Sequence, residues 1–330
     1  MSGRRVLVTG GGGFLGRRIV EMLVERGDAV RSFSRGEYPE LRALGVDVRR
    51  GELESARDVR RACEGYEVVY HAAALPGIWG DYQEYHRPNV VGTRNVLEAC
   101  RAAGARALVY TSSPSVVFDG RDMEGVDESA PYPDRYEAHY PRTKAIAERE
   151  VLEANGPMLA TVSLRPHLIW GPRDNHLVPR IFARAHTLRR IGGLNKLVDS
   201  TYIDNAAEAH VLAGDSLRPG APHAGRAYFI SNGEPRPIWD LVSGILAAGG
   251  LPPVTRSVPY SVALTAAATM EAGWRLLRIR REPKLTRFLV HELTTAHWFN
   301  ISAARRAFGY VPRVTIEEGL ARLKEWLKKS

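Results

Sequence analysis

The sequence predicts an α/β fold, a doubly wound parallel sheet with a smaller, interleaved carboxy-terminal part. Short apolar runs alternate with amphipathic helical segments through the first half of the chain. A glycine-rich turn separates the first apolar run from the first helical segment. Strands that alternate with helices in this way form βαβ units and a parallel sheet. The strands expected on this basis are 5–9, 29–33, 46–48, 67–71, 107–110 and 160–164.

The helices between these strands are predicted from their apolar periodicity and from the glycines that end them. A weaker helical turn is expected near 41–44. The main expected helices are 14–26, 55–64, 89–103 and 138–154.

The regular alternation fades after Arg165-Pro166, although a helix at 204–213 and a strand at 227–231 are still expected. We therefore expect a first domain at 1–170 and a mainly substrate-binding region at 171–330. Segments near 198–232 are expected to return to the first domain.

Composition excludes several classes of protein. With 330 residues, 44% of them hydrophobic and 25% charged, the chain is expected to bury a large core. Two cysteines are too few for a disulfide scaffold or a cysteine-based metal cluster, so we expect no metal and a cytoplasmic location. No apolar run is long enough for a transmembrane helix. The net charge of +9 comes from scattered arginines without a basic tract, so no nucleic-acid partner is expected.

The glycine turn predicts a dinucleotide site. Gly10, Gly13 and Gly16 lie between the first strand and the first helix, with Phe14 and Leu15 inside the pattern. The first glycine allows a tight turn, the second lets the backbone approach a pyrophosphate, and the third allows close packing of helix on strand. The free N–H groups at the start of the helix then favour an anion.

The end of the second strand indicates which dinucleotide is bound. An Asp or Glu is usual there when unphosphorylated NAD is the ligand. This chain has Ser34 and Arg35 instead, and an arginine can pair with a 2′-phosphate. The sequence therefore favours NADPH. The alternative is that Arg35 is an ordinary surface residue.

Three further residues predict acid–base chemistry on a carbonyl group. Tyr140 and Lys144 are four residues apart on an expected helix, so both side chains lie on one face. A nearby ammonium lowers the pKa of a phenol, which would make Tyr140 a usable proton donor. Ser113 follows the strand that ends at Tyr110 and can donate a hydrogen bond to a substrate carbonyl oxygen. Ser115 is a second candidate for that role.

Together, these motifs in this order resemble the extended short-chain dehydrogenase/reductase superfamily over nearly the whole chain. The segments 71–74, 89–97 and 164–172 also match that family's patterns, and Gly51-Glu52-Leu53 stands where the family usually has Gly-Asp-Leu at the adenine. The resemblance implies that Lys144 and Tyr140 contact the cofactor, and that Asn89 holds a helix kink or a relay water. Further cofactor contacts implied by it are Glu52, Leu53, Ala72, Ala73, Ala74, Asn89, Thr111, Pro166 and Ile169.

Within that superfamily, the chain resembles the 3β-hydroxysteroid dehydrogenase branch. In that branch it resembles the reductases of 2-alkyl-3-oxoalkanoic acids in bacterial olefin and β-lactone biosynthesis. Segments 168–177, 197–205, 228–235 and 285–290 carry this likeness. The resemblance implies NADPH-dependent reduction of the 3-ketone of a long-chain β-keto acid. It also implies assembly with β-lactone synthetase-type enzymes and a homodimer formed through 89–103 and 138–154.

Two other functions remain open at this stage. One is an NAD(P)-dependent 3β-hydroxysteroid or sterol dehydrogenase that works in the oxidative direction. Ser34 and Arg35 count against it, because oxidative members usually prefer NAD. The other is a non-catalytic dinucleotide-sensing regulator, and the presence of Tyr140 and Lys144 counts against that reading.

Three sets of residues are candidates for contacts with the substrate or with a membrane, and each has an alternative explanation. Segment 75–79 could wall the pocket, whereas Trp79 and Trp170 are equally explained as core or lid packing. Segment 260–281 combines an apolar face with a basic end, which is typical either of a helix at a membrane surface or of a core-packing helix. Candidate partners for the substrate carboxylate are Arg173, His176 and Arg180, each of which can equally be an ordinary surface residue.

Overall fold

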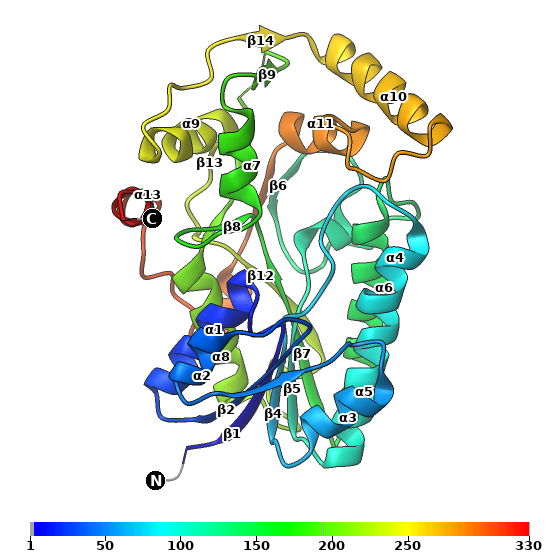
Figure 1. Cartoon of the computed structure of the whole chain (residues 1–330), viewed down its shortest axis with the longest axis vertical. Helices are drawn as coiled ribbons and strands as arrows, with labels where there is room; N and C mark the ends of the chain where they lie inside the picture. The colour runs from blue at the N-terminus through cyan, green and yellow to red at the C-terminus, as the bar shows by residue number, and fades with distance from the viewer. Residues whose placement is uncertain (1–2, 194, 330) are drawn as a thin grey trace.

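The centre of the molecule is a parallel sheet of seven strands (Figure 1). The computed structural model describes residues 3–193 and 195–329. The sheet order is β12-β7-β5-β4-β1-β2-β3, so the chain moves outward from β1 in both directions. This doubly wound order confirms the predicted fold class, and its switch point lies between β1 and β4. The strands are β1 (Arg5–Thr9), β2 (Ala29–Ser34), β3 (Asp47–Arg50), β4 (Val68–His71), β5 (Ala107–Thr111), β7 (Ala160–Pro166) and β12 (Arg226–Ile230).

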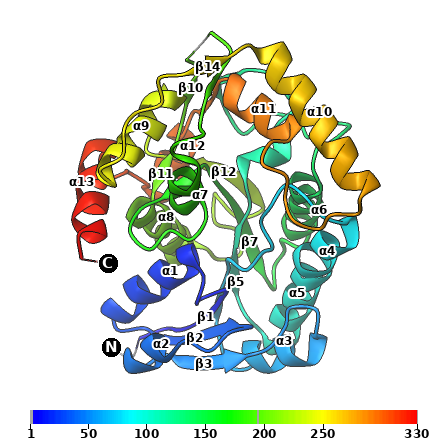
Figure 2. The same ribbon diagram turned by 45° about the horizontal axis from the view of Figure 1, so that its top comes forward.

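Helices cover both faces of this sheet (Figure 2). Alternate side chains of a strand point to opposite faces, and β1 shows the result. Val6 and Val8 pack in one core with α1 and α8, while Leu7 packs in the other with α3 and α5. Because both faces are buried there, the central strands β1, β4 and β5 are mainly apolar, whereas β2 and the edge strand β3 carry polar side chains. The first face carries α1 (Phe14–Glu25), α8 (Ile203–Ser216) and α12 (Ser302–Phe308), and the second carries α3 (Ala56–Cys63), α5 (Gly92–Ala103) and α6 (His139–Glu153). The short α2 (Pro39–Ala43) precedes β3.

The helix predicted at 89–103 begins earlier than expected. Helix α4 (Tyr82–His86) leads without a break into a π-helical turn, η1 (Arg87–Val91), and then into α5. Asp81 and Glu84 form a capping box that starts α4. The predicted start was therefore wrong by seven residues, because this cap lies about two helical turns before the predicted start. The π turn contains Asn89, and such turns are frequent at functional sites.

The second half of the chain builds its own core above the carboxyl ends of the strands. Trp170, Tyr202 and Trp239 are buried in it with residues of three helices. These helices are α7 (Leu177–Arg184), α9 (Ile238–Ala248) and α13 (Ile316–Leu327). Short strands complete this part: β8 (Ile169–Trp170) with β11 (Thr201–Tyr202), β9 (Arg190–Ile191) with β14 (Ser257–Val258), and a sheet ordered β13 (Arg236–Pro237), β10 (Leu197–Val198), β15 (His297–Phe299) and β6 (Met123–Val126).

The two halves of the chain are interleaved. Strand β6 comes from the first half but pairs with β15, and the 3-10 turn η2 (Pro114–Val117) precedes it. Conversely, β12 comes from the second half and pairs with β7 at the edge of the main sheet. The division of the chain at residue 170 stays a prediction.

Two helices lie outermost, α10 (Tyr260–Leu276) and α11 (Arg287–Thr294), at the top of Figure 1. They share a small core made by Ala263, Ala267 and Val290 with Ile191 of β9. Across residues 3–193 and 195–329, no helix combines the length and apolar character needed to span a membrane.

Candidate active site

The glycine turn after β1 adopts the close packing that the sequence predicts. Gly10 has a φ of +71°, and its N–H donates to the carbonyl oxygen of Phe33 over 2.8 Å. A Cβ atom on Gly16 would lie 2.2 Å from the carbonyl oxygen of Gly10, so only glycine fits there. A Cβ atom on Gly13 would meet only that same oxygen, at 3.2 Å. The backbone at Gly13 is therefore open on its outer side, as the approach of a pyrophosphate requires.

The start of α1 has free hydrogen-bond donors. Gly13 is the N-cap and offers no side-chain acceptor, and no acidic residue lies in the first turn. The N–H groups of that turn are therefore available to an anion. A hollow of about 390 Å³ lies alongside and is lined by Gly12, Gly13 and Phe14 from the turn and by Asp204 and Arg322, among others, from the second half.

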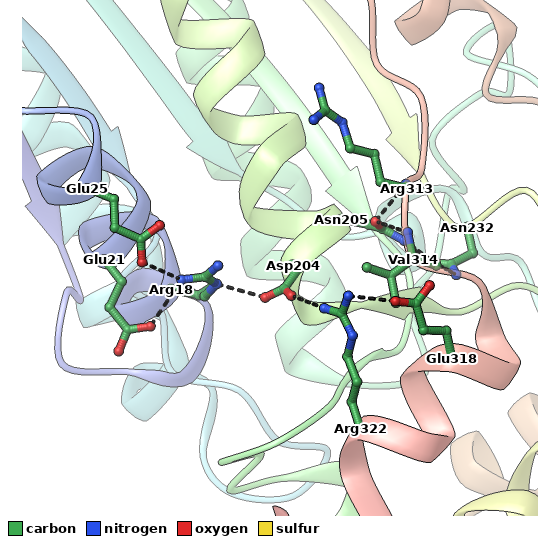
Figure 3. Close-up of polar contacts among 10 residues, drawn as sticks. All are labelled: Arg18, Glu21, Glu25, Asp204, Asn205, Asn232, Arg313, Val314, Glu318 and Arg322. Atoms are coloured by element: carbon green, nitrogen blue, oxygen red, sulfur yellow. Dashed lines mark hydrogen bonds and ion pairs between the residues drawn. The ribbon is translucent and has the colours of Figure 1, made fainter. Parts of the chain in front are cut away.

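Ion pairs hold α1 against the second half of the chain (Figure 3). Asp204, at the start of α8, accepts from Arg18 of α1 over 2.7 Å and from Arg322 of α13 over 3.0 Å. Glu318 binds the other end of the Arg322 guanidinium over 2.6 Å. Beside them, Asn205 donates to the backbone oxygen of Val314 over 2.8 Å. The helix that follows the glycine turn is thus fixed by both halves of the chain.

The residues at the end of β2 lie beside the glycine turn. Ser34 accepts a hydrogen bond from the N–H of Gly12 over 3.3 Å. Arg35 is exposed, and among the described residues its guanidinium has no hydrogen-bond or ion-pair partner. Glu52 is also exposed, whereas Leu53 is buried and its carbonyl oxygen accepts from Asn95 over 2.8 Å. Arg35 is therefore free to pair with a ligand.

The segment after β4 is held against the glycine turn. The N–H of Ala72 donates to the carbonyl oxygen of Thr9 over 3.2 Å, and Ala73 abuts Gly10 closely enough to exclude a Cβ atom there. Ala74 follows in the same half-buried stretch. Beneath it, His71 lies between the hydroxyls of Thr9 and Thr93, and burial lowers its pKa to about 3, so its ring is neutral.

Asn89 uses its amide to join three elements. Its side-chain oxygen accepts from the N–H of Leu75 over 2.7 Å. Its side-chain nitrogen donates to the oxygen of Leu75 and to the hydroxyl of Thr143 on α6, each over 3.1 Å. Asn89 thus fixes the segment after β4 to the helix that carries Tyr140. Its predicted contact with a cofactor stays a prediction.

Ser113, Tyr140 and Lys144 come together at the carboxyl ends of β4 and β5. The Ser113 hydroxyl lies 2.9 Å from that of Ser115. Burial raises the pKa of Tyr140 to about 12, and the nearby Ser113 hydroxyl opposes the rise. Two hydroxyl donors therefore lie next to each other where a carbonyl oxygen could bind.

Lys144 is almost wholly buried one helical turn from Tyr140. Its Nζ donates to the carbonyl oxygen of Thr111 over 2.6 Å and lies 4.0 Å from the centre of the Tyr110 ring. Burial lowers the pKa of Lys144 to about 7, and Glu148 opposes that fall. The expectation that Lys144 lowers the pKa of Tyr140 stays a prediction. Burial dominates the pKa of Tyr140, and the group that opposes it is Ser113.

The remaining predicted cofactor contacts lie along the same edge of the sheet. Thr111 ends β5, and its hydroxyl lies 2.9 Å from His210 of α8. Pro166 is the buried last residue of β7, and Ile169 is half-buried in β8. Phe14 and Leu15 are half-buried at the start of α1. All of these residues are thus close to the strand ends, where ligands of such folds bind.

The two tryptophans considered for the substrate pocket, Trp79 and Trp170, differ in their surroundings. Trp170 is fully buried and donates to Ser200 over 3.0 Å, so it is a core residue. Trp79 is half-buried, and its indole N–H donates to the carbonyl oxygen of Ile279 over 3.1 Å, which joins segment 75–79 to the loop after α10.

Two of the three candidates for the substrate carboxylate already have acidic partners. Arg173 pairs with Glu21 over 2.8 Å, and Arg180 pairs with Glu282 over 3.0 Å. His176 is exposed, and partial desolvation lowers its pKa.

Two buried charged residues, Glu148 on the helix of Lys144 and Arg165 on β7, were not among the site residues predicted from the sequence. Glu148 and Arg165 form a buried ion pair over 2.6 Å directly behind Lys144 on α6. One signal was present in the sequence, because Glu148 follows Lys144 by four residues on a predicted helix and so shares its face. The Arg165 side of the pair depends on the packing of α6 on β7 and has no local signal.

The chain belongs to the 3-beta hydroxysteroid dehydrogenase/isomerase family, whose pattern matches residues 7–259. It is 52% identical to the 2-alkyl-3-oxoalkanoate reductase of Stenotrophomonas maltophilia (strain K279a), over 97% of this chain and 98% of that protein. It is 48% identical to the 2-alkyl-3-oxoalkanoate reductase of Shewanella oneidensis, over 96% of this chain and 84% of that protein. The family expected from the sequence is therefore confirmed, and the chain is an oxidoreductase.

A solved structure of a similar chain contains a nicotinamide dinucleotide. The chain superimposes with a TM-score of 0.75 on the crystal structure of MoeE5 in complex with UDP-glucose and NAD, at 25% identity, covering 98% of this chain and 99% of that one. The family and this neighbour show that the protein depends on a nicotinamide dinucleotide. The glycine turn and the open N–H groups of α1 are the parts of the structure that fit it.

Proposed function

We propose that this protein reduces the 3-ketone of a long-chain 2-alkyl-3-oxoalkanoic acid to the 2-alkyl-3-hydroxyalkanoic acid, with NADPH as the reductant. The observation that carries the proposal is the pairing of the Ser113 and Tyr140 hydroxyls, with buried Lys144 one turn away. The similarity over nearly full length to two reductases with that named activity supports the substrate class.

The roles of the side chains follow from their positions. Ser113 and Tyr140 donate hydrogen bonds to the ketone oxygen and stabilise the negative charge that develops on it. When bound, a nicotinamide dinucleotide supplies the hydride that reaches the carbonyl carbon. Tyr140 then transfers its phenolic proton to that oxygen, which completes the hydroxyl group. The Lys144 ammonium favours the phenolate that remains, because opposite charges attract strongly at a buried site.

Two observations support NADPH as the physiological reductant. Arg35 directly follows β2, and its guanidinium has no partner among the described residues; no carboxylate stands at the end of that strand to bind an unphosphorylated ribose. An arginine in that position can make charge-assisted hydrogen bonds to a 2′-phosphate.

The stability of the product supports the direction of the reaction. β-Keto acids lose carbon dioxide readily, whereas β-hydroxy acids do not.

The second candidate function is oxidation of a 3β-hydroxysteroid or related sterol, which the family itself favours. The same hydroxyl pair would serve it, with Tyr140 acting as the base instead of the acid. The two functions differ in the substrate they accept and in the direction of hydride transfer.

One experiment separates the two. The absorbance of NADPH is followed with a synthetic 2-alkyl-3-oxo fatty acid, and the reduction of NAD is followed in parallel with a 3β-hydroxysteroid. Rapid loss of NADPH with the keto acid alone is the expected result. Turnover of the steroid without turnover of the keto acid would replace the proposal by the second candidate.

A further inference from the structure

Glu148 is the centre of a buried polar network behind the catalytic residues. Its side chain is fully buried, and that of Arg165 on β7 is 3% exposed. The guanidinium binds both carboxylate oxygens, with Nε 3.1 Å from each and Nη2 2.6 Å from Oε1. Ser163 donates to the carboxylate over 2.6 Å and Tyr132 over 2.7 Å. Such a network is costly to bury, so its presence in the fold calls for a functional explanation.

These contacts keep Glu148 ionised. Burial alone would raise its pKa, but the charge of Arg165 and the hydrogen bonds from Arg165, Ser163 and Tyr132 outweigh burial. The pKa of Glu148 therefore lies below its ordinary value. A negative charge is thus fixed in the interior, one helical turn from Lys144.

Lys144 depends on that charge to remain protonated. Burial lowers its pKa to about 7, and Glu148 is the residue that counteracts burial. The ammonium itself does not bind the carboxylate but donates to the Thr111 carbonyl oxygen over 2.6 Å. The influence of Glu148 on Lys144 is therefore electrostatic and acts across one turn of α6.

The other titratable groups around Lys144 are uncharged. His71 of β4 is neutral because burial lowers its pKa to about 3. Tyr110 of β5 is a neutral phenol because burial raises its pKa well above the usual value. The charged groups at this place are therefore Lys144, Glu148 and Arg165, whose formal charges leave one net positive charge.

We propose that Glu148 and Arg165 are positioning residues for proton transfer: Glu148 keeps Lys144 charged, and Arg165 offsets Glu148 so that the Lys144 charge remains available to Tyr140. This inference rests on the roles proposed above for Tyr140 and Lys144. When the Tyr140 O–H bond breaks and its proton moves to the ketone oxygen, the phenolate that forms brings the net charge of the group to zero. Glu148 without Arg165 would already have cancelled the Lys144 charge before that step.

The first test measures the protonation of Lys144 directly and needs no substrate. The chain has six lysines, so NMR of protein labelled with ¹³C at lysine Cε gives few signals, and Lys144→Met identifies the one that matters. In Glu148→Gln, the titration midpoint of Lys144 should fall by at least about one pH unit relative to the unmutated protein. Glu148→Asp retains the charge and should restore most of the difference.

Matched variants distinguish the effect of the Glu148 charge on the Lys144 midpoint from the effect of a disturbed local structure. Tyr132→Phe removes one hydrogen bond to Glu148 but no charge, so its Lys144 midpoint should stay within about 0.3 pH units of the original. If Glu148→Gln does not fold, the double variant Glu148→Gln/Arg165→Met removes both charges together, which proteins tolerate better than an unpaired buried ion. Its Lys144 midpoint should also lie below that of the unmutated protein.

The second test is the pH profile of kcat/KM for ketone reduction. Reduction needs the protonated lysine, so the alkaline limb of the profile should move to lower pH in Glu148→Gln by the same amount as the NMR midpoint. An unchanged Lys144 midpoint in Glu148→Gln, or an equal shift in Tyr132→Phe, would overturn the inference. A shifted midpoint in a protein without ketone reductase activity would instead count against the proposed function and leave the electrostatic link standing.

Discussion

The ammonium of Lys144 lies 2.6 Å from the carbonyl oxygen of Thr111, inside the protein and at the end of the central strand β5. One buried charge is thus held at the carboxyl end of the sheet by a backbone dipole. The cost of burying it should be visible in the stability of the protein.

Lys144 should make stability depend on pH. Its pKa falls from 10.5 to about 7 on folding, so between these values the unfolded chain holds a proton that the folded chain has released. Stability contributed by this residue therefore rises with pH across that window, and its cost is largest below about pH 7.

Lys144→Met removes this dependence. Urea unfolding measures the free energy of unfolding of the variant minus that of the unmutated protein. This difference should be most favourable to the variant near pH 6 and should shrink by up to about 4 kcal/mol near pH 10. The packing of the lysine side chain adds the same amount to this free-energy difference at every pH, so it does not change how the difference depends on pH. If the difference in unfolding free energy is the same at pH 6 and at pH 10, Lys144 stays charged in the folded protein.

The glycine turn should tolerate no side chain at position 16. In Gly16→Ala, the new Cβ would meet the Gly10 carbonyl oxygen at 2.2 Å, so the turn must open and its N–H groups move. NADPH affinity measured by calorimetry should fall by at least about tenfold. Gly273→Ala on α10 is the control, because a Cβ there has no neighbour within 4 Å, and it should bind NADPH normally. Normal binding by Gly16→Ala would refute the placement of the pyrophosphate.

Arg35 should select the phosphorylated cofactor. Arg35→Ala is expected to raise the KM for NADPH by about tenfold or more while leaving the KM for NADH nearly unchanged, since only NADPH carries the 2′-phosphate. Steady-state kinetics with each cofactor checks this. Arg60→Ala, an exposed arginine on α3, is the matched control and should alter neither value. Equal effects on both cofactors would remove Arg35 from the ribose site.

The outer end of α10 provides a test of the predicted membrane contact. Leu276 and Leu277 are 83% and 69% exposed and lie directly before the arginines at 278, 280 and 281. Apolar groups beside cations favour anionic lipid surfaces. The protein should sediment with phosphatidylglycerol vesicles, and Leu276→Glu/Leu277→Glu should weaken this by about tenfold.

The controls for that experiment follow from the exposed apolar residues. Met158 is 80% exposed but distant in sequence from α10, so Met158→Glu should sediment as the unmutated protein does. Trp274 is a poorer choice for substitution, because its indole N–H donates to the backbone carbonyl oxygen of Arg281 over 3.0 Å and holds the end of the helix. If the unmutated chain stays in the supernatant with anionic vesicles, segment 260–281 is not a membrane surface.

Much of the first half could be predicted because its signals are local. The strand at Arg5–Thr9 and the glycines that follow show the β1–α1 unit within about a dozen residues, and α6 is marked by its apolar periodicity. The predicted limits of α6, 138–154, are its caps, one residue outside the helix at either end. Tyr140 and Lys144 are found in the same way, since their spacing alone places them on one face.

The rest depends on contacts between distant segments. Strand β6 pairs with β15, which lies more than 170 residues later in the sequence. Nothing in the sequence of either strand indicates which strand it pairs with. The same is true of Arg165, which meets Glu148 only when α6 packs on β7. The burial that raises the pKa of Tyr140 could not be predicted for a related reason, because helix spacing predicts a neighbour but not how deeply both side chains are buried.

The most direct test of the proposed mechanism compares the unmutated protein with Tyr140→Phe, using NADPH and a synthetic 2-alkyl-3-oxo fatty acid. The variant keeps the ring and loses only the phenolic proton donor. We expect kcat to fall by about 10²–10⁴-fold while NADPH affinity stays within about threefold, because the cofactor's phosphates bind elsewhere. A variant that still reduces the ketone at the original rate would contradict the assignment of Tyr140 as the proton donor and, with it, the proposed mechanism.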